Sequence, residues 1–396
     1  MKLLIVEPEI KGHFISLYVR NVIKAQKKNI KIYLLTSPKI KNSEVLKIIK
    51  KDNPSVKLLY TDQLAYPKNK NIFNLIIFQI YNFIKIKNRI NYLDKVFIFD
   101  HIFFSNLDHF DKILSFFSNP FNSKTFSGIL VNPRVHQFYS KKKFRIKYLI
   151  YNYFISNLLK NIYLKKIMTN DILFYNFSKN VFLSKKINYF NEPVDSYLPT
   201  YNSNKINLKN KTLKILIYGS IRYSKSLEEI ILLVKNLKSK IEITVTIAGM
   251  HQKDVKTILS YKNLLKEGVK ENFKILNKFI NPVDERKLFE KTDLVWCLYK
   301  YTPLGSSGVF HLSNRYIKPV ITNDEGLLGW YNKKYKLGPI LNFNDSINIK
   351  RSINTIQKLH RRKDKIKQYS RNQLKLYKMI KKQTKFTIIM RNLMTY

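Results

Sequence analysis

The stretch of residues 213–248 constrains the fold of this chain more than any other. It begins with a short apolar run, LKILIY, which predicts a buried parallel strand that ends at Gly219, where the backbone can turn sharply. Apolar residues then recur at helical spacing, and Ser226 with Glu229 predicts a capping box at the start of that helix. A second apolar run, residues 243–248, closes the unit. The stretch therefore predicts a strand–helix–strand crossover.

The loop between this first strand and the helix carries two cations, Arg222 and Lys225. Charge-assisted hydrogen bonds and the dipole of the following helix both favour an anion at such a place. The loop therefore predicts a binding site for a phosphate or a diphosphate. The alternative interpretation is that both residues are merely exposed side chains of a basic protein.

The chain is strongly basic, with 73 Lys and Arg residues, 26 Asp and Glu residues and a formal net charge of +47. Such a charge draws a protein to anionic surfaces, either membrane or nucleic acid. Part of it has another origin, because Lys, Ile, Asn, Tyr and Phe are abundant together, which is typical of a bias towards AT-rich codons. No nucleic-acid motif is recognised and the aromatic residues follow apolar faces, so we expect no specific nucleic-acid partner.

Length and composition limit the class of protein further. The 396 residues, of which 45% are hydrophobic, suit two or three domains, each with its own core. The single cysteine, Cys297, permits no disulfide within the chain, which predicts a reducing cytosol. The opening MKLLIVEP is too short an apolar stretch for a signal peptide and predicts a strand. Residues 72–84 are interrupted by polar side chains and fall short of the ~20 residues of a membrane span. We expect a cytoplasmic protein that is soluble or peripheral on the inner face of the membrane.

The first half of the chain opens with another strand–loop–helix–strand unit. Its strands are expected at residues 2–6 and 31–36, and Gly12 and His13 stand where the loop meets the helix.

Three more apolar runs, at residues 96–99, 128–131 and 181–183, predict further buried strands of the same sheet. Ligands of open parallel sheets bind outside the carboxyl ends of the strands. We therefore expect the polar residues that follow the first two of these runs to face one cleft: Asp100, His101 and Asn132.

Residues 141–168 have apolar residues at helical spacing and lysines grouped at both ends. One interpretation is an amphipathic helix that is buried on one face. The other is a basic, aromatic helix that lies on an anionic membrane surface.

The second half repeats the alternation of strands and helices after a polar, aperiodic linker at residues 200–211. Four of its loops lie at predicted strand ends and contain the glycine and serine residues that let backbone amides approach an anion. They are GSIRYSK (219–225), AGMHQ (248–252), LGSSG (304–308) and DEGLLG (324–329). The chain as a whole is predicted to be α/β, with two doubly wound Rossmann-like domains that face a cleft.

The second half also resembles the C-terminal domain of GT-B glycosyltransferases of the large retaining group 1, or family 4, type. The matching segments are ILIYGSIRYSKSLEEIILLV, ITVTIAG, FINPVDERKLFEKTDLVWCLY, SSGVFHLSNRYIKPVIT and NDEGLLGWYNKKYKLG. The first half opens with IVEPEIKGHFISLYVRNVIKA, which is similar to the start of the acceptor domain of that family. The resemblance is tight across residues 213–338 and loose across about 60–200.

This resemblance implies an acceptor-binding domain at residues 1–205 and a nucleotide-sugar-binding domain at residues 212–375. A C-terminal basic helix, residues 376–396, is expected to pack back on the first domain. The family holds the donor diphosphate with an Arg and a Lys, which correspond to Arg222 and Lys225. Other residues expected at the diphosphate are Gly12, Gly219, Ser306, Ser307 and Gly308. Fixed cations stabilise the charge that grows on the leaving diphosphate, so neither a metal nor a cofactor is expected.

One departure from the family concerns two glutamates, spaced eight apart, that touch the sugar and the ribose of the donor. Leu304 and Leu312 occupy those positions here, and an SSG sequence fills the loop. Glu325 and Gly326 are the candidates that replace them at the donor sugar or nucleotide; the alternative is that Glu325 is a solvated loop acid.

On the acceptor side, His13, Asp100, His101 and Asn132 are the candidates for orienting or deprotonating an acceptor hydroxyl, and each has an equally good structural explanation. The leading hypothesis is a glycosyltransferase that moves a sugar from a nucleotide-diphosphate-sugar to a saccharide or lipid-linked acceptor, in the synthesis of a surface polysaccharide or glycolipid. The anionic membrane surface is a further expected partner. The alternatives are a catalytically inactive nucleotide-sugar-binding protein and, third, a nucleic-acid-binding protein.

Overall fold

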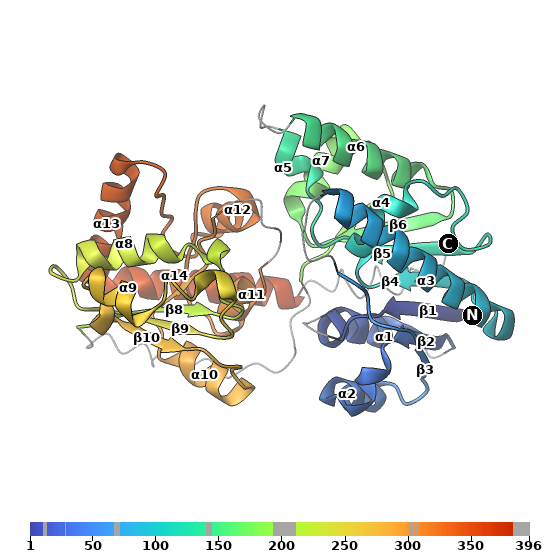
Figure 1. Ribbon diagram of the computed structural model, residues 1–396, viewed down its shortest axis with the longest axis horizontal. Coiled ribbons are helices and arrows are strands. Elements are labelled where there is room, and N and C mark those ends of the chain that lie inside the picture. The colour runs from blue at the N-terminus through green and yellow to red at the C-terminus, as the bar shows by residue number, and fades with distance from the viewer. Residues whose placement is uncertain are drawn as a thin grey trace. The chain divides into compact units, whose positions relative to one another are not determined.

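The computed structural model describes residues 1–10, 14–27, 29–66, 72–139, 145–192, 211–300, 305 and 307–382. These residues belong to two compact units, the first ending at residue 192 and the second running from residue 211 to Lys382 (Figure 1). Each unit is a parallel β-sheet with helices packed against it, so the predicted α/β class is confirmed.

The first unit contains a seven-stranded sheet in the order β3-β2-β1-β4-β5-β6-β7, and its registers are parallel throughout. Its strands are β1 (Lys2–Glu7), β2 (Lys31–Thr36), β3 (Lys57–Tyr60), β4 (His101–Phe104), β5 (Thr125–Ile129), β6 (Leu164–Thr169) and β7 (Ile187–Tyr189).

Helices cover both faces of this sheet, because alternate residues of its strands are buried in two different cores. Leu4 and Val6 belong to one core cluster, whereas Leu3 and Ile5 belong to another. The helices are α1 (Arg20–Ala25), α2 (Glu44–Asp52), α3 (Ile72–Phe97), α4 (Asp111–Leu114), α5 (Val135–Tyr139), α6 (Arg145–Lys160) and α7 (Ile172–Val181), with shorter helical turns η1 (Phe14–Val19), η2 (Pro38–Asn42) and η3 (Leu107–His109).

Two predicted strands of the first unit are wrong. Residues 96–99 span the end of the long helix α3, and the strand begins only at His101. The chain leaves the helix through Ile98, which has a left-handed φ of 53°, while Phe99 is fully buried. The apolar run VFIF thus belongs to a helix end and a turn, which periodicity cannot separate from a short strand. Residues 181–183 likewise form the end of α7 and an exposed left-handed turn at Leu183.

The segment 141–168, predicted as one helix, contains two elements. Helix α6 ends at Lys160, and β6 begins at Leu164. Asn161 makes this turn, because its backbone carbonyl accepts from the Leu164 amide and its side-chain oxygen accepts from the Tyr163 amide at 2.9 Å. Residues 141–144 lie outside the described part of the chain.

The second unit contains a five-stranded parallel sheet in the order β10-β9-β8-β11-β12. Its strands are β8 (Leu213–Tyr218), β9 (Ile243–Ala248), β10 (Phe273–Leu276), β11 (Leu294–Trp296) and β12 (Val320–Ile321). The helices are α8 (Leu227–Leu237), α9 (Tyr261–Lys266), α10 (Pro282–Glu290), α11 (Gly308–Arg315), α12 (Gly326–Tyr335), α13 (Ser346–Arg361) and α14 (Lys363–Lys382), with turns η6 (Tyr223–Lys225), η7 (Lys253–Val255) and η8 (Lys270–Asn272).

The crossover predicted for residues 213–248 is confirmed as β8, α8 and β9. The predicted capping box at its centre is wrong. Ser226 adopts a left-handed conformation, with φ 53° and ψ 51°, and makes no side-chain cap hydrogen bond. A capping residue needs extended φ and ψ angles to turn its side chain onto the first helical amides, so the left-handed backbone of Ser226 prevents the motif.

The C-terminal part of the chain is helical as far as it is described. Residues 376–382 are the last turns of α14, which packs on α11 and α12 of the second unit. Residues 383–396, the rest of the predicted basic helix, lie outside the described residues, as do 200–210 of the predicted linker. In the part of the chain that the structure describes, no helix is long and apolar enough to cross a membrane.

Two glycines of the second unit test this architecture. A Cβ on Gly249 would lie 1.8 Å from the carbonyl oxygen of Gly219, and its φ of 137° is strained for any other residue. We expect Gly249→Ala to lower the free energy of unfolding by ~3 kcal/mol or more. Gly308→Ala is the matched control, because its Cβ would meet no atom within 4 Å. Denaturant unfolding of both variants checks this, and equal stabilities would contradict the packing of β8 against β9.

Candidate functional site

The strand orders of both sheets locate a candidate site in each unit. In an open parallel sheet, ligands bind at the carboxyl ends of the strands where the order reverses. That point lies between β8 and β11 in the second unit and between β1 and β4 in the first.

In the second unit, the chain leaves β8 through Gly219, which has a φ of 91°. The Gly219 amide donates to the carbonyl of Ala248, and the Ile221 amide donates to the carbonyl of Met250 at 2.9 Å. The loop after β8 therefore continues along the loop after β9 for a few residues before it turns into η6. This turn carries both predicted phosphate ligands.

Lys225 is buried at the carboxyl end of β8, with only 3% of its surface exposed. Its ammonium group donates to the carbonyl of Tyr218 at 2.8 Å and lies 5.3 Å from the ring centre of Tyr299. Burial lowers the pKa of Lys225 to about 8. A buried ammonium group with one carbonyl and an aromatic face as neighbours is stabilised strongly by an anion placed beside it.

Arg222 begins the same turn and is exposed. The Lys225 amide donates to the carbonyl of Arg222 at 2.9 Å, and the Tyr223 amide donates to a carboxylate oxygen of Asp254 at 3.1 Å. The backbone between the two cations is therefore held from both sides. The turn presents one buried and one exposed cation within four residues.

Tyr299, just after β11, joins this turn to the serine-rich loop. Its hydroxyl lies 2.8 Å from Oγ of Ser307, while its ring lies beside Lys225. A Cβ on Gly219 would lie 3.5 Å from the side chain of Val309. The loop at residues 219–225 thus meets residues 307–309 at one edge, and of the predicted donor residues the structure brings together Gly219, Lys225, Ser307 and Gly308.

Ser307 caps α11, because its Oγ accepts from the Phe310 amide. Gly308 is exposed at the first position of that helix. Glu325 and Gly326 lie further along the same edge, at the start of α12 after β12, and Glu325 is exposed. Ser306 lies outside the described residues.

Lys300, after β11, also holds the elements at this edge of the second sheet together. Its ammonium group pairs with Glu228 and Glu229 in the first turn of α8 and donates to the Tyr223 hydroxyl at 3.1 Å. These contacts tie the end of β11 to the start of α8. Tyr299 and Lys300 are not among the residues predicted from the sequence, although the signal was available: they are the first polar residues after the apolar run LVWCL.

In the first unit, Glu7 ends β1 at the switch point and is fully buried. The Ser105 hydroxyl lies 2.6 Å from one of its carboxyl oxygens, and the Glu9 amide donates to the other at 2.9 Å. Burial raises the pKa of Glu7 to about 7. Glu7 is also absent from the site residues predicted from the sequence. An acidic residue directly after the apolar run LLIV was the feature that could have indicated it.

Asp108 and His109 lie beyond β4 at the same edge. Burial raises the pKa of Asp108 to about 7, although its carboxylate accepts from the Val131 and Asn132 amides at 3.0 and 3.1 Å. Burial lowers the pKa of His109 to about 4, and Nε2 of its ring lies 2.9 Å from the amide nitrogen of Asn106. Asn132, a predicted acceptor-side residue, is exposed here after β5.

Asp100 and His101 do not reach this edge, which corrects their predicted placement. Because β4 begins at His101, both residues lie at the amino end of the strand. Asp100 accepts from the Lys2 amide at 2.7 Å, and Nδ1 of the buried His101 ring lies 2.8 Å from the Thr125 hydroxyl. Gly12 and His13 lie outside the described residues. Among the residues that are described, no group of three or more His, Cys, Asp or Glu side chains could hold a metal ion.

The two parallel sheets with their flanking helices define the class: the chain has the GT-B fold of glycosyltransferases. Within it, residues 200–373 match the family model of group 1 glycosyl transferases. This range contains the whole edge formed by Gly219, Arg222, Lys225 and Ser307.

The similar solved structures span the whole chain at low identity. WaaG, a glycosyltransferase of lipopolysaccharide biosynthesis, is 13% identical with a TM-score of 0.62, and the match covers 98% of this chain and 99% of that one. Sucrose-phosphate synthase from Thermosynechococcus elongatus is 11% identical with a TM-score of 0.67, covering 98% and 97%. HepE from Anabaena, solved with UDP-glucose, is 13% identical with a TM-score of 0.61, covering 98% and 98%. No curated protein sequence matches the chain.

The buried carboxyl group of Glu7 predicts a pH-dependent stability. The pKa of Glu7 in the folded protein, about 7, lies above the ordinary value of 4.5. Its favourable contribution to the free energy of unfolding is therefore full below pH 4.5 and is lost as the pH rises towards 7. In Glu7→Gln this loss disappears. We expect the stability of the variant relative to the natural protein to rise by ~3 kcal/mol between pH 4.5 and 7.

Denaturant unfolding across that pH range measures the difference. Glu44→Gln is the control, because that side chain is exposed at the start of α2. A Glu7→Gln curve that runs parallel to that of the natural protein would show that Glu7 is ionised in the fold.

Proposed function

We propose that this protein is a glycosyltransferase that moves a sugar from a nucleotide-diphosphate-sugar to an acceptor hydroxyl. The observation that supports this best is the turn at the carboxyl end of β8, where Lys225 is buried at the point of strand reversal and Arg222 begins the same turn. The match of residues 200–373 to group 1 glycosyl transferases supports the same conclusion.

The proposed chemistry follows from the charges on this turn. When the bond between the sugar and the diphosphate breaks, negative charge grows on the leaving phosphate oxygen. Lys225 is already desolvated, so its attraction to that charge is not weakened by water, and no reorganisation is needed at the moment of reaction. Arg222 contributes a second cation with the fork geometry that suits phosphate. In this proposal, Gly219, Ser307 and Gly308 let the backbone approach the diphosphate, and neither a metal nor a cofactor takes part.

The finer assignments rest on similarity and on the first unit. HepE was solved with UDP-glucose and WaaG acts in lipopolysaccharide biosynthesis. By similarity to these proteins, we propose that the transferred sugar is a hexose and that its anomeric configuration is retained. We further propose that the acceptor is a saccharide or a lipid-linked saccharide. The reaction would then contribute to a surface polysaccharide or glycolipid made at the inner face of the membrane. The first-unit edge, with Asp108, His109 and Asn132, has the carboxyl, imidazole and amide groups that hydrogen-bond sugar hydroxyls. Glu325 and Gly326 are proposed for the donor sugar or nucleotide.

A nucleotide-sugar-binding protein without turnover is the second candidate. Leu312, on the second turn of α11, stands where the resembled family has a glutamate at the donor. Calorimetry with nucleotide-sugars beside a turnover assay separates the two candidates, because binding without turnover supports the second alone.

Removal of the two cations tests the proposal directly. We expect Arg222→Ala with Lys225→Met to lower kcat/KM at least ~1000-fold, because two charge-assisted contacts to the diphosphate disappear. Methionine preserves most of the volume of the buried lysine stem and removes its charge. Turnover of the nucleotide-sugar that gives the largest thermal shift is the measurement.

The matched control is Lys256→Met with Arg286→Ala, which removes the same charges from exposed positions of the same unit. It should leave kcat/KM within about twofold of the natural value, since both side chains are exposed and neither belongs to the loop after β8. Full activity in the Arg222 and Lys225 variant, with its unfolding transition intact, would overturn the proposal.

Donor binding should also depend on pH through Lys225. Its pKa of about 8 in the free protein must rise when a diphosphate binds, so binding takes up a proton above pH 8. We expect the Kd for a nucleotide-sugar to increase ~tenfold per pH unit above 8 until the pKa of the complex is reached. Calorimetry in buffers of different ionisation enthalpy measures the proton directly. Lys225→Met should bind weakly at every pH with no uptake, and an unchanged uptake would assign the proton to another group.

A further inference from the structure

Helix α3 of the first unit exposes a continuous apolar stripe. Phe73, Ile77, Ile80, Tyr81 and Ile84 are exposed, at 75, 59, 37, 54 and 49% of their surface. Their spacing of three, four and seven residues places them on one side of the helix. The opposite side, with Phe83, Ile86, Ile90 and Leu93, is buried in the core.

Helix α6 exposes a second stripe, formed by Ile146, Leu149 and Tyr153. Its buried side contributes Ile155, Leu158 and Leu159 to the same core cluster as α3. Both helices therefore lie on the same side of the sheet and turn their exposed stripes away from it.

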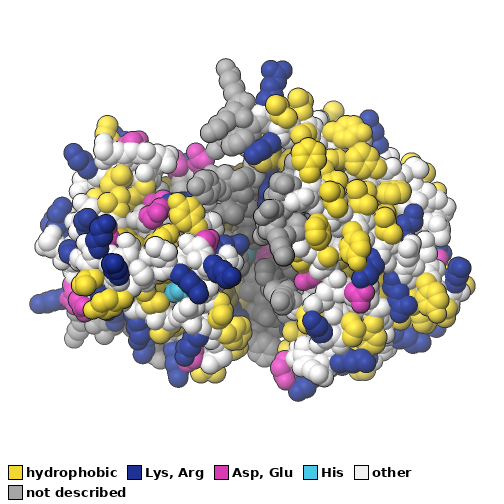
Figure 2. All heavy atoms as spheres, in the orientation of Figure 1, with side chains coloured by type: hydrophobic (Ala, Val, Ile, Leu, Met, Phe, Trp, Pro, Cys, Tyr) yellow, Lys and Arg dark blue, Asp and Glu magenta, His cyan; other side chains and the backbone are white. Residues whose placement is uncertain are grey.

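The segment after α4 extends the exposed stripe of α6 and packs against the buried side of α3. Its exposed Phe116 lies 6.3 Å from Tyr153 of α6, measured between ring centres, and Phe117 lies 5.1 Å from Phe83 of α3. Figure 2 shows hydrophobic side chains gathered over the part of the first unit where α3, α4 and α6 lie in Figure 1. We call this surface the α3–α6 face: Phe73, Ile77, Ile80, Tyr81, Ile84, Phe116, Ile146, Leu149 and Tyr153.

The charge on these helices is mostly positive, although Lys85 of α3 pairs with the exposed Asp62 at 2.7 Å. Helix α6 contains no carboxylate, and the single acid of α3, Asp94, lies 3.5 Å from the ammonium group of Lys124. Basic residues accompany both stripes: Lys85, Lys87, Arg89, Lys95, Arg145, Lys147 and Lys160.

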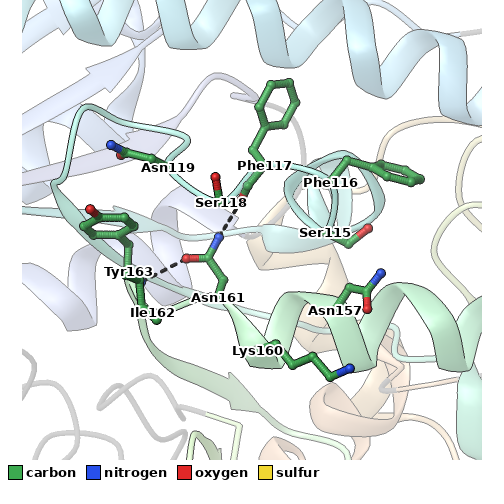
Figure 3. Close-up of a pocket in the computed structure, with 10 residues that line it drawn as sticks. All are labelled: Ser115, Phe116, Phe117, Ser118, Asn119, Asn157, Lys160, Asn161, Ile162 and Tyr163. Atoms are coloured by element: carbon green, nitrogen blue, oxygen red, sulfur yellow. Dashed lines mark hydrogen bonds between the residues drawn. The ribbon is translucent and has the colours of Figure 1, made fainter.

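A pocket of about 520 Å³ opens at the end of this face, between the segment after α4 and the end of α6 (Figure 3). Phe116 and Ile162 supply apolar walls, while Lys160 and the amides of Asn119 and Asn157 supply polar ones. Its floor is fixed by Asn161, whose side-chain amide donates to the Phe117 carbonyl at 2.7 Å.

We propose that the α3–α6 face docks on a lipid bilayer that contains anionic lipids, with the pocket at its end next to a lipid phosphate. Exposed large apolar residues at this density mark an interaction surface. Aliphatic and aromatic side chains accompanied mainly by lysines and arginines match the boundary between acyl chains and anionic headgroups. A second copy of this chain is disfavoured as the occupant, because two faces of the same sign would meet. The inference deepens the membrane part of the proposed function and does not require sugar transfer.

Vesicle binding tests this docking. We compare the natural protein with Ile77→Ser, Tyr81→Ser, Ile84→Ser in one chain, using co-sedimentation with vesicles of phosphatidylcholine with and without phosphatidylglycerol. The variant should bind the anionic vesicles at least ~tenfold more weakly, because three side chains no longer enter the interface. The matched control is Leu265→Ser, Phe279→Ser, Val283→Ser, which removes three exposed apolar side chains from the second unit. It should bind like the natural protein.

Charge is tested separately with Lys95→Gln and Lys160→Gln, which should reduce the preference for anionic vesicles and its dependence on salt. Equal vesicle binding by the α3 variant and the natural protein would overturn the proposal, as would an equal loss in the second-unit control. Sedimentation velocity without lipid tests whether the face binds a second copy of the chain. If the natural protein is a dimer, the α3 variant is a monomer and vesicle binding is unchanged, the face is a dimer interface and the membrane proposal is overturned.

Failure here is distinguishable from failure of the proposed function. The α3 variant should bind nucleotide-sugar like the natural protein, and the Arg222→Ala, Lys225→Met variant should bind vesicles normally. All of the α3 substitutions are at exposed positions, so circular dichroism should show an unchanged fold.

Discussion

The buried ammonium group of Lys225 is the interaction on which the edge of the second unit depends. Burial of a charge costs free energy, and the carbonyl of Tyr218 together with the face of Tyr299 offsets only part of that cost. The residual deficit appears as a pKa lowered to about 8. An anion that binds there offsets the remaining cost of burying the charge. The same desolvation that lowers the stability of the free protein therefore strengthens its attraction for a phosphate. Tyr299, Ser307 and Lys300 are arranged around this one group and connect it to α11 and α8.

At the corresponding edge of its own sheet, the first unit carries carboxyl and imidazole groups instead of cations. Glu7 is fully buried there and Asp108 and His109 are partly buried. Desolvation raises the pKa of Glu7 and of Asp108 to about 7 and lowers the pKa of His109 to about 4. Near neutral pH, His109 is therefore neutral, while Glu7 and Asp108 are each about half protonated. Neutral donors and acceptors suit hydroxyl groups, while the cations of the second unit suit phosphate. The buried sides of α3 and α6 belong to one core cluster of the first unit, so both helices lie on the same side of its sheet.

Several elements could be predicted because short-range physics determines them. The crossover of β8, α8 and β9 follows from the change of hydrophobic period within residues 213–248. The runs at 96–99 and 181–183 were misassigned because a few apolar residues at a helix end look like a strand until the helix before them is seen. That error moved Asp100 and His101 to the wrong edge of the sheet. The predicted capping box at Ser226 is absent because Ser226 has a left-handed backbone, which the residue types alone do not indicate.

The sequence by itself determined the α/β class, the two-sheet organisation and the positions of Arg222 and Lys225 on the loop after β8, because hydrophobic period and loop composition are local properties. Only the tertiary structure decided that Lys225 is buried and Arg222 exposed, since burial depends on Tyr299, more than seventy residues further along the chain. It also brought Glu7 beside Ser105, and Phe116 beside Tyr153 of α6. Such contacts form only when the order of the strands is fixed, and strand order follows from the packing of the whole sheet.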